Sequence, residues 1–313
     1  MSNEEKFIIN LLFSSSENQN INFSNLKIDN LIKISSNHLI IPSLYTELNK
    51  KIELIKIPKK LYDYFGYIFD ENLKRNKTII EEIRFVNTCL RKKNILPVFL
   101  KGAALSILEL HRNIGSRMIG DIDILVPDSQ YDETFDVLVK NGYKSKKIRF
   151  FEKKAIHKPR LVSNNKLFAV EVHNKLLIND KNNLLNPKKI LKDAINIKGI
   201  QTPNFHDLIL HNIYSYEIND RANLFLNYSF RNLYDISVIL KNNESLLLNK
   251  KNKYFDDYFS KAKYIGIDFK NINHKTRIMT SFRFNLKKRY KIFNKIDNGL
   301  SWAYLKIVQK PSQ

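Results

Sequence analysis

Residues 98–126 read VFLKGAALSILELHRNIGSRMIGDIDILV, and this stretch decides the fold. A short apolar run, Val98–Leu100, leads into Lys101-Gly102 and then into an amphipathic segment. A second apolar run carries Asp121 and Asp123. Side chains alternate along a strand, so these two carboxylates should share one face. The order predicts a strand, a glycine turn, a helix over Ala103–Arg112 and a second strand with an acidic pair.

The acidic pair is a candidate metal site. Two carboxylates held this close repel each other unless a cation lies beside them. Mg²⁺ is commonly bound by carboxylates together with substrate phosphates. Asp121 and Asp123 therefore predict a metal–nucleotide site, although a surface Asp pair after a glycine turn would have the same spacing. Ile122, Ile124 and Val126 should lie on the opposite face of the strand, in the core.

The whole pattern resembles a known superfamily. A strand, Lys-Gly, a helix, Arg117 and then Gly-Asp-Ile-Asp-Ile-Leu-Val is similar to the nucleotidyltransferases. More narrowly it resembles a bacterial family of uncharacterised nucleotidyltransferases with an LKG…R…DxD pattern. In that family a third carboxylate lies in a later strand, followed by a His, and the matching residues here are Glu171 and His173. The resemblance covers roughly residues 5–240 and is most specific at Lys101–Val126.

The resemblance implies transfer of a nucleoside monophosphate from an NTP such as ATP to a hydroxyl or phosphate acceptor, with release of pyrophosphate. Asp121, Asp123 and Glu171 would be the catalytic and metal-binding residues, holding two Mg²⁺ ions. One ion would hold the triphosphate and the other would lower the pKa of the acceptor hydroxyl. Glu171 would alternatively act as general base. His173 would orient Glu171 or a metal-bound water, unless it is a structural residue of the strand.

A second group of residues is expected to bind the nucleotide. Gly102 allows the backbone to approach a phosphate closely. Helix N–H groups from Ala103 onward would face the triphosphate. Lys101 and Arg117 would supply positive charge to phosphate oxygens, unless they are an ordinary strand-end lysine and a loop arginine. Many superfamily members have Ser or Gly where this chain has Ala103, so a hydroxyl contact to phosphate is missing.

The amino-acid composition indicates which binding partners and which cellular compartment to expect. Among 313 residues, 53 Lys and Arg outnumber 31 Asp and Glu, giving a net charge of +22. This surplus favours polyanions and so an RNA or tRNA acceptor, but a general enrichment in Lys would produce it too. A protein or small-molecule acceptor, a toxin-like role and an antitoxin partner stay open. The single cysteine, Cys89, indicates a reducing compartment. No apolar run approaches the roughly 20 residues of a membrane span, so we expect a cytoplasmic chain with no membrane partner.

The chain divides into three regions by pattern. Residues 1–95 should form an N-terminal helical region, 96–180 the nucleotidyltransferase core, and 181–313 a C-terminal helical domain. The expected class is α+β, with a small mixed β-sheet flanked by helical regions on both sides in sequence. Strands are expected at residues 97–100, 119–126, 143–152, 157–163 and 167–177.

Other readings stay open beside the leading one. The chain has no P-loop, no G-x-G-x-x-G and no H-E-x-x-H motif, which disfavours several enzyme classes. A non-catalytic nucleotide- or RNA-binding module on a degenerate nucleotidyltransferase fold is the alternative, and phosphoryl transfer is a third reading. Arg231 and Asp235, four residues apart, should form an ion pair on a helix.

Overall fold

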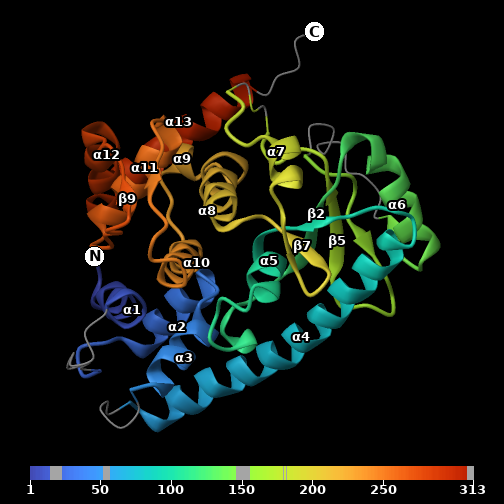
Figure 1. Cartoon of the computed structure of the whole chain (residues 1–313). Helices are drawn as coiled ribbons and strands as arrows, with labels where there is room; N and C mark the ends of the chain where they lie inside the picture. Colours follow the sequence, from blue (N-terminus) through green and yellow to red (C-terminus); the bar gives the residue numbers. More distant parts are fainter. Residues whose placement is uncertain (15–22, 52–56, 146–155, 179, 181, 309–313) are drawn as a thin grey trace.

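The molecule is built around a mixed seven-stranded sheet (Figure 1). The computed structural model describes residues 1–14, 23–51, 57–145, 156–178, 180 and 182–308. Strand order is β3-β4-β5-β2-β1-β7-β6. The pairs β2–β5 and β1–β7 are parallel and the other neighbours are antiparallel. The strands are β1 (Val98–Phe99), β2 (Asp121–Leu125), β3 (Lys144–Ser145), β4 (Leu161–Val162), β5 (Ala169–His173), β6 (Ile195–Ile197) and β7 (Ile200–Thr202).

The register between β2 and β5 sets the position of the acidic residues. Asp123 lies opposite Glu171, and Leu125 lies opposite His173. Because side chains alternate on both strands, Asp121, Asp123, Glu171 and His173 all emerge on the same face of the sheet. The shared face predicted for the acidic pair is present, and it extends to the neighbouring strand.

The opposite face of the sheet is covered by two helices, α4 (Lys59–Arg91) and α6 (Tyr131–Lys140). Ile122, Ile124 and Val126 lie in the apolar cluster formed there and are fully buried, which confirms the predicted core positions. Burying such side chains contributes about 1.5–3 kcal/mol each to stability. The alternation of apolar and acidic residues therefore fixes which face of β2 carries the site.

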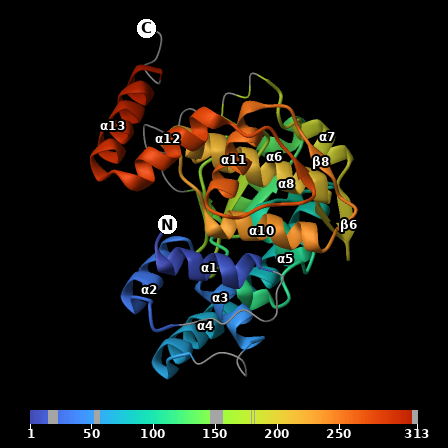
Figure 2. The same ribbon diagram turned by 90° about the vertical axis from the view of Figure 1, so that its left-hand side faces the viewer.

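The acidic face is covered by helices from both ends of the chain. Val98 and Leu125 join a second apolar cluster with α5 (Lys101–Ile107), α8 (Phe205–Tyr214) and α10 (Phe230–Lys241). The same cluster includes α1 (Asn3–Phe13), α2 (Ile28–Asn37) and α3 (Ile41–Asn49). Figure 2 shows α1 to α4 below α10 and α11. The two helical regions thus share one core.

The remaining elements come from the last third of the chain. They are α7 (Pro187–Lys192), α9 (Ala222–Phe225), β8 (Leu248–Asn249), α11 (Lys253–Tyr264), β9 (Ile272–Asn273), α12 (Ile278–Arg289) and α13 (Lys291–Val308), with a π-helical turn at Ser215–Asn219. Helices of this region flank the sheet, and the predicted fold class is confirmed. The division into three domains stays a prediction, and the β6–β7 hairpin, from the range 181–313, completes the edge of the sheet.

Several sequence expectations differ from the structure at their boundaries. The strands expected at residues 157–163 and 167–177 are the shorter β4, Leu161–Val162, and β5, Ala169–His173. The helix expected up to Arg112 ends at Ile107, because Glu109 takes a left-handed conformation with φ of +52°. Of the strand expected over residues 143–152, β3 covers Lys144–Ser145, and residues 146–155 lie outside the described part of the chain. Within the helices that the structure describes, none has both the length and the apolarity to cross a membrane.

Candidate active site

The centre of the site is a buried group of two carboxylates and one imidazole. Ligand atoms of Asp123, Glu171 and His173 all lie within 4.8 Å of one another. His173 Nε2 is 2.9 Å from Asp123 Oδ1 and 3.8 Å from Glu171 Oε2. The parallel pairing of β2 and β5 brings these residues together although about fifty positions separate them in sequence. Asp121 does not belong to this group of three.

A guanidinium links Asp121 to the group. Arg160 Nη2 lies 2.7 Å from Asp121 Oδ2, and its Nε lies 2.7 Å from Glu171 Oε1. A second imidazole, His157, is 3.6 Å from Glu171 Oε2. The sequence analysis missed both basic residues. The segment 157–163 was expected to be a strand, but nothing in its spacing connects it to the acidic residues of other strands.

Lys101 is a further positively charged side chain in direct contact with the carboxylates. Its Nζ is 2.6 Å from Asp123 Oδ1. The backbone of Lys101 is left-handed, with φ of +48°, a conformation that lysine rarely adopts and that is found mainly where surrounding structure enforces it. Burial would lower the pKa of Lys101, but the charge of Asp123 outweighs it and raises that pKa. Lys101 is therefore a fixed cation beside the carboxylates.

The three carboxylates differ in their electrostatics. Burial alone would raise the pKa of Asp123, but Lys101 and His173 hold it well below its usual range. Burial and then the charge of Asp123 raise the pKa of both Asp121 and Glu171. Lys101 and Arg160 compensate two of the three negative charges. The carboxylates are therefore not fully neutralised by these two side chains, and an added cation would be attracted to them.

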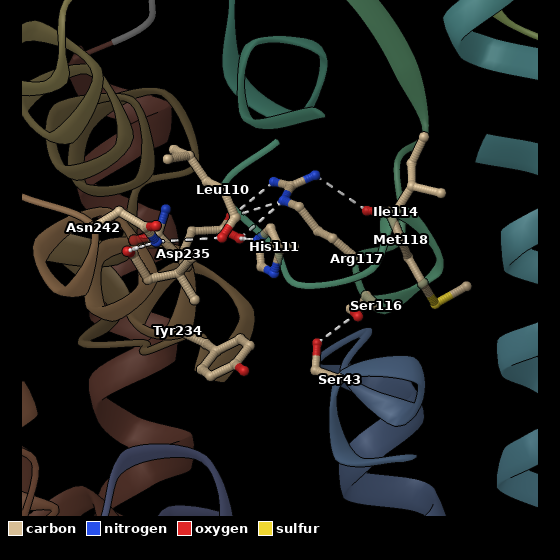
Figure 3. Close-up of polar contacts among 12 residues, drawn as sticks. Ser43, Leu110, His111, Ile114, Ser116, Arg117, Met118, Tyr234, Asp235 and Asn242 are labelled. Carbon is tan, nitrogen blue, oxygen red and sulfur yellow. Dashed lines mark hydrogen bonds and ion pairs between the residues drawn. The ribbon is translucent and has the colours of Figure 1, made fainter. Parts of the chain in front are cut away.

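Arg117 pairs with Asp235, which lies 118 residues further along the chain (Figure 3). Its Nε is 2.9 Å from Asp235 Oδ1 and its Nη2 is 2.8 Å from Asp235 Oδ2, a two-pronged pair between buried side chains. His111 Nε2 lies 3.2 Å from the same carboxylate. The predicted pair between Arg231 and Asp235 is wrong, because Arg117 takes Asp235. The phosphate-binding role of Arg117 stays a prediction.

Gly102 is explained by this arginine. A Cβ at Gly102 would clash with Arg117 Nη1 and would lie 3.2 Å from Ile119 Cγ2. The absence of a side chain at this position therefore makes room for the guanidinium. Ala103, next in sequence, has its side chain buried in the apolar cluster under α4. The expected contacts of Gly102 and Ala103 with phosphate stay predictions.

The long helix α4 holds the loop before β2 and the start of β5. Asn72 Nδ2 donates to the carbonyl oxygens of Gly115 and Arg117, at 2.7 and 3.0 Å. Asn76 Nδ2 donates to Arg117 O at 2.7 Å. Glu82 accepts from the backbone N–H groups of residues 167 and 168 at 2.8 and 3.2 Å. Polar side chains of an N-terminal helix thus position both acidic strands.

Three further ionisable residues, from the C-terminal half of the chain, interact electrostatically with Lys101 or Arg117. Burial lowers the pKa of His211 to about 3, and the next largest influence is the charge of Lys101. Burial raises the pKa of Asp220, and Lys101 and Arg231 partly oppose this. Burial and then the charge of Arg117 lower the pKa of Arg231. The acidic face of the sheet is therefore bordered by a neutral histidine of α8 and by ionisable groups of α10 and of the turn between these helices.

The residues present fit a divalent cation. Carboxylate oxygens are ligands for Mg²⁺, and imidazole is accepted by Mn²⁺ and Zn²⁺. Burial lowers the pKa of His173, so its ring is neutral, and Nε2 donates to Asp123. The lone pair then resides on Nδ1, which is buried and has no hydrogen-bond partner among the described residues. The oxygens of Asp123 and Glu171 would therefore be the ligands of such a cation, and His173 would join them only in its other tautomer, with the proton on Nδ1 and the lone pair on Nε2.

A mixed sheet with acidic residues on one face of adjacent parallel strands is the class of fold expected of a nucleotidyltransferase. The chain belongs to the family described as "Uncharacterised nucleotidyltransferase", whose model matches residues 24–253. The crystal structure of the Megavirus polyadenylate synthase matches with a TM-score of 0.35 and 18% sequence identity. That match covers 70% of this chain and 42% of the synthase, so the chain spans less than half of that protein's length. No curated protein matches the chain.

Proposed function

We propose that the protein transfers a nucleoside monophosphate from an NTP to a hydroxyl or phosphate acceptor and releases pyrophosphate. The observation that supports this most strongly is the register of β2 and β5, which sets Asp123 directly opposite Glu171 beside His173. Family membership supports the same class of reaction. The acceptor is proposed to be RNA, in view of the net charge of +22, with a protein or small molecule as the other options.

Asp121, Asp123 and Glu171 are proposed to hold two Mg²⁺ ions. When bound, such ions neutralise the triphosphate and lower the pKa of the acceptor hydroxyl. His173 donates to Asp123 and so fixes the orientation of that carboxylate. Lys101, 2.6 Å from Asp123, is proposed to bind phosphate oxygens once the nucleotide is present. Arg117, held by Asp235 against Gly102, is proposed to support this turn from behind.

The proposed step is an in-line displacement. The acceptor oxygen forms a bond to the α-phosphorus, and the bond from that phosphorus to the oxygen bridging to the β-phosphorus breaks. Pyrophosphate leaves with the bonding electrons. The proton of the acceptor hydroxyl passes to the carboxylate of Glu171 if that residue acts as general base, and to solvent if it acts as a metal ligand.

One observation favours a second candidate function. Arg160 bridges Asp121 and Glu171, at 2.7 Å from each, where a cation would be needed for catalysis. A site in which arginine permanently takes that position would bind nucleotide or RNA without transferring a nucleotide. The two functions differ in whether Arg160 leaves the carboxylates when metal is supplied.

A transfer assay with labelled ATP tests the proposal. The wild type, with Mg²⁺ and an RNA acceptor pool, should incorporate label from α-labelled but not from γ-labelled ATP. Asp123→Asn and Glu171→Gln should each reduce incorporation at least about 100-fold, because each removes a metal ligand. Glu133→Gln, an exposed acid on α6, is the matched control and should leave the rate unchanged. Incorporation from γ-labelled ATP would indicate phosphoryl transfer, and equal rates in all variants would reject the site.

A further inference from the structure

The last helix, α13, carries an exposed apolar face. Ile292, Ile296, Leu300 and Tyr304 follow one another at intervals of four residues and so align along one side of the helix. Their exposed fractions are 75, 57, 67 and 56%. Asp297, Ser301 and Leu305, each one residue after a stripe residue and so about 100° further around the helix, are buried. We call the four exposed residues the α13 stripe.

This stripe is unusual for a protein surface. Single exposed apolar residues are common, but contiguous apolar faces mark interaction sites. Gly299 and Ala303 lie between the stripe residues, so no polar side chain interrupts it. Figure 2 shows α13 at the edge of the molecule, beyond α12. The family match ends at residue 253, so this helix lies outside the segment shared with the family.

Positive charge borders the stripe. Lys291, Lys295 and Lys306 are exposed on the same helix, and Trp302, 54% exposed, lies on their side of it. The sequence from Ile278 to Val308 contains one acidic residue, Asp297, which is buried and paired with Arg283. An apolar strip flanked by lysines and a tryptophan is the pattern of helices that lie in a membrane interface.

We propose that α13 docks on an anionic lipid surface, with the α13 stripe entering the boundary between headgroups and acyl chains. The lysines would meet the anionic headgroups and add electrostatic attraction to the burial of the stripe. A second copy of the chain fits less well, because it would place the same lysines near one another with no exposed carboxylate on the helix to neutralise them. The proposal concerns surface binding and departs from the expectation of no membrane partner, which rested on the lack of a spanning segment.

Trp302 provides a direct reporter, because it is the only tryptophan in the chain. The full chain is mixed, without NTP, with vesicles of phosphatidylcholine and phosphatidylglycerol in equal parts, or of phosphatidylcholine alone. With the anionic vesicles we expect co-sedimentation and a shift of tryptophan emission to shorter wavelength. With neutral vesicles we expect little of either.

The stripe is tested with Ile296→Glu combined with Leu300→Glu, which should reduce the vesicle-bound fraction about tenfold or more. Both side chains face solvent, so the fold should persist, and circular dichroism and the melting temperature check this. Leu247→Glu is the matched control: Leu247 is 76% exposed and adjoins β8, on the other side of the molecule in Figure 2. This control should bind like the wild type.

Three results would overturn the proposal. The first is no binding to anionic vesicles, which would leave a protein as the partner of the stripe. The second is equal binding by the stripe variant, which would assign the binding to general positive charge. The third is a dimer by light scattering that the stripe variant abolishes, which would make α13 a self-association surface. None of these results bears on the transfer reaction, because no nucleotide is present.

Discussion

Arg160 occupies the position in the site where a catalytic cation would be expected. Its guanidinium is 2.7 Å from both Asp121 and Glu171, so a metal ion entering between them must displace it or share their oxygens. Removing one positive charge about 4 Å away changes a cation's binding energy by about 1–4 kcal/mol, depending on the local dielectric. Metal binding at this site therefore depends directly on the position of the Arg160 guanidinium.

Arg160→Gln should bind Mn²⁺ about tenfold more tightly than the wild type, measured by calorimetry or by the electron paramagnetic resonance of free Mn²⁺. Lys158→Gln is the matched control, two residues earlier, because Lys158 pairs with the exposed Asp132 and not with the site. Weaker Mn²⁺ binding by Arg160→Gln would contradict this expectation. It would mean that Arg160 holds the carboxylates in place for the metal.

Asp235 links acid stability to the ion pair with Arg117. Burial would raise its pKa, but Arg117 and His111 lower it from 3.8 to about 2. A depressed pKa stabilises the folded state above pH 3.8, and this contribution of about 2 kcal/mol is lost as the pH falls towards 2. Asp235→Asn should lack this acid-dependent loss and should cost about 3–5 kcal/mol at neutral pH, because Arg117 is left buried and unpaired.

Urea unfolding between pH 2 and 7 measures both effects. Asp136→Asn, an exposed carboxylate on α6, is the control and should follow the wild type. An Asp235→Asn protein that loses stability on acidification as steeply as the wild type would disprove this linkage.

At the scale of elements, the strand–turn–helix from β1 to α5 depends on one glycine. Gly102→Ala would push a methyl group into the guanidinium of Arg117, which is buried and tied to Asp235 and cannot move freely. We expect a loss of about 1–3 kcal/mol of stability, as for other overpacked sites. Gly120→Ala, where a Cβ meets nothing within 4 Å, should change the melting temperature little. Equal losses in both variants would contradict this explanation of Gly102.

The sequence was sufficient to predict the parts of the site that depend on alternation within a strand. Asp121 and Asp123 on one face of β2, with Ile122 and Ile124 in the core, follow from a period of two. The pairing of Arg117 with Asp235 could not be predicted, because 118 residues separate them and each has nearer candidate partners. Arg160 was missed for the same reason: its contacts depend on how β4 and β5 pair.

The boundaries that failed have a local cause. The helix after Gly102 was expected to run to Arg112, but Glu109 and Lys101 both adopt positive φ without being glycine or asparagine. Such conformations depend on the surrounding structure, and residue type does not reveal them. Lys101 is paired with Asp123, and Glu109 with Lys198.

At the scale of the whole molecule, helices from both ends of the chain share one core. Phe7 and Leu44 belong to the same apolar cluster as Leu208, Phe230 and Phe284. The division of the chain near residues 95 and 180 should therefore not correspond to independently folding units. We expect one cooperative transition in scanning calorimetry, with calorimetric and van't Hoff enthalpies that agree. Two resolved transitions would contradict the shared core and support the three-part division.

The proposed reaction requires that Asp121, Asp123 and Glu171 hold divalent cations beside a bound NTP. A crystal structure with Mn²⁺ and an ATP analogue that cannot be cleaved between the α- and β-phosphates tests it most directly, because Mn²⁺ is located by anomalous scattering. We expect an anomalous peak within bonding distance of Asp123 and Glu171, the triphosphate next to Lys101, and Arg160 withdrawn from at least one carboxylate. A nucleotide bound elsewhere, with Arg160 still bridging Asp121 and Glu171 and no peak between them, would contradict it.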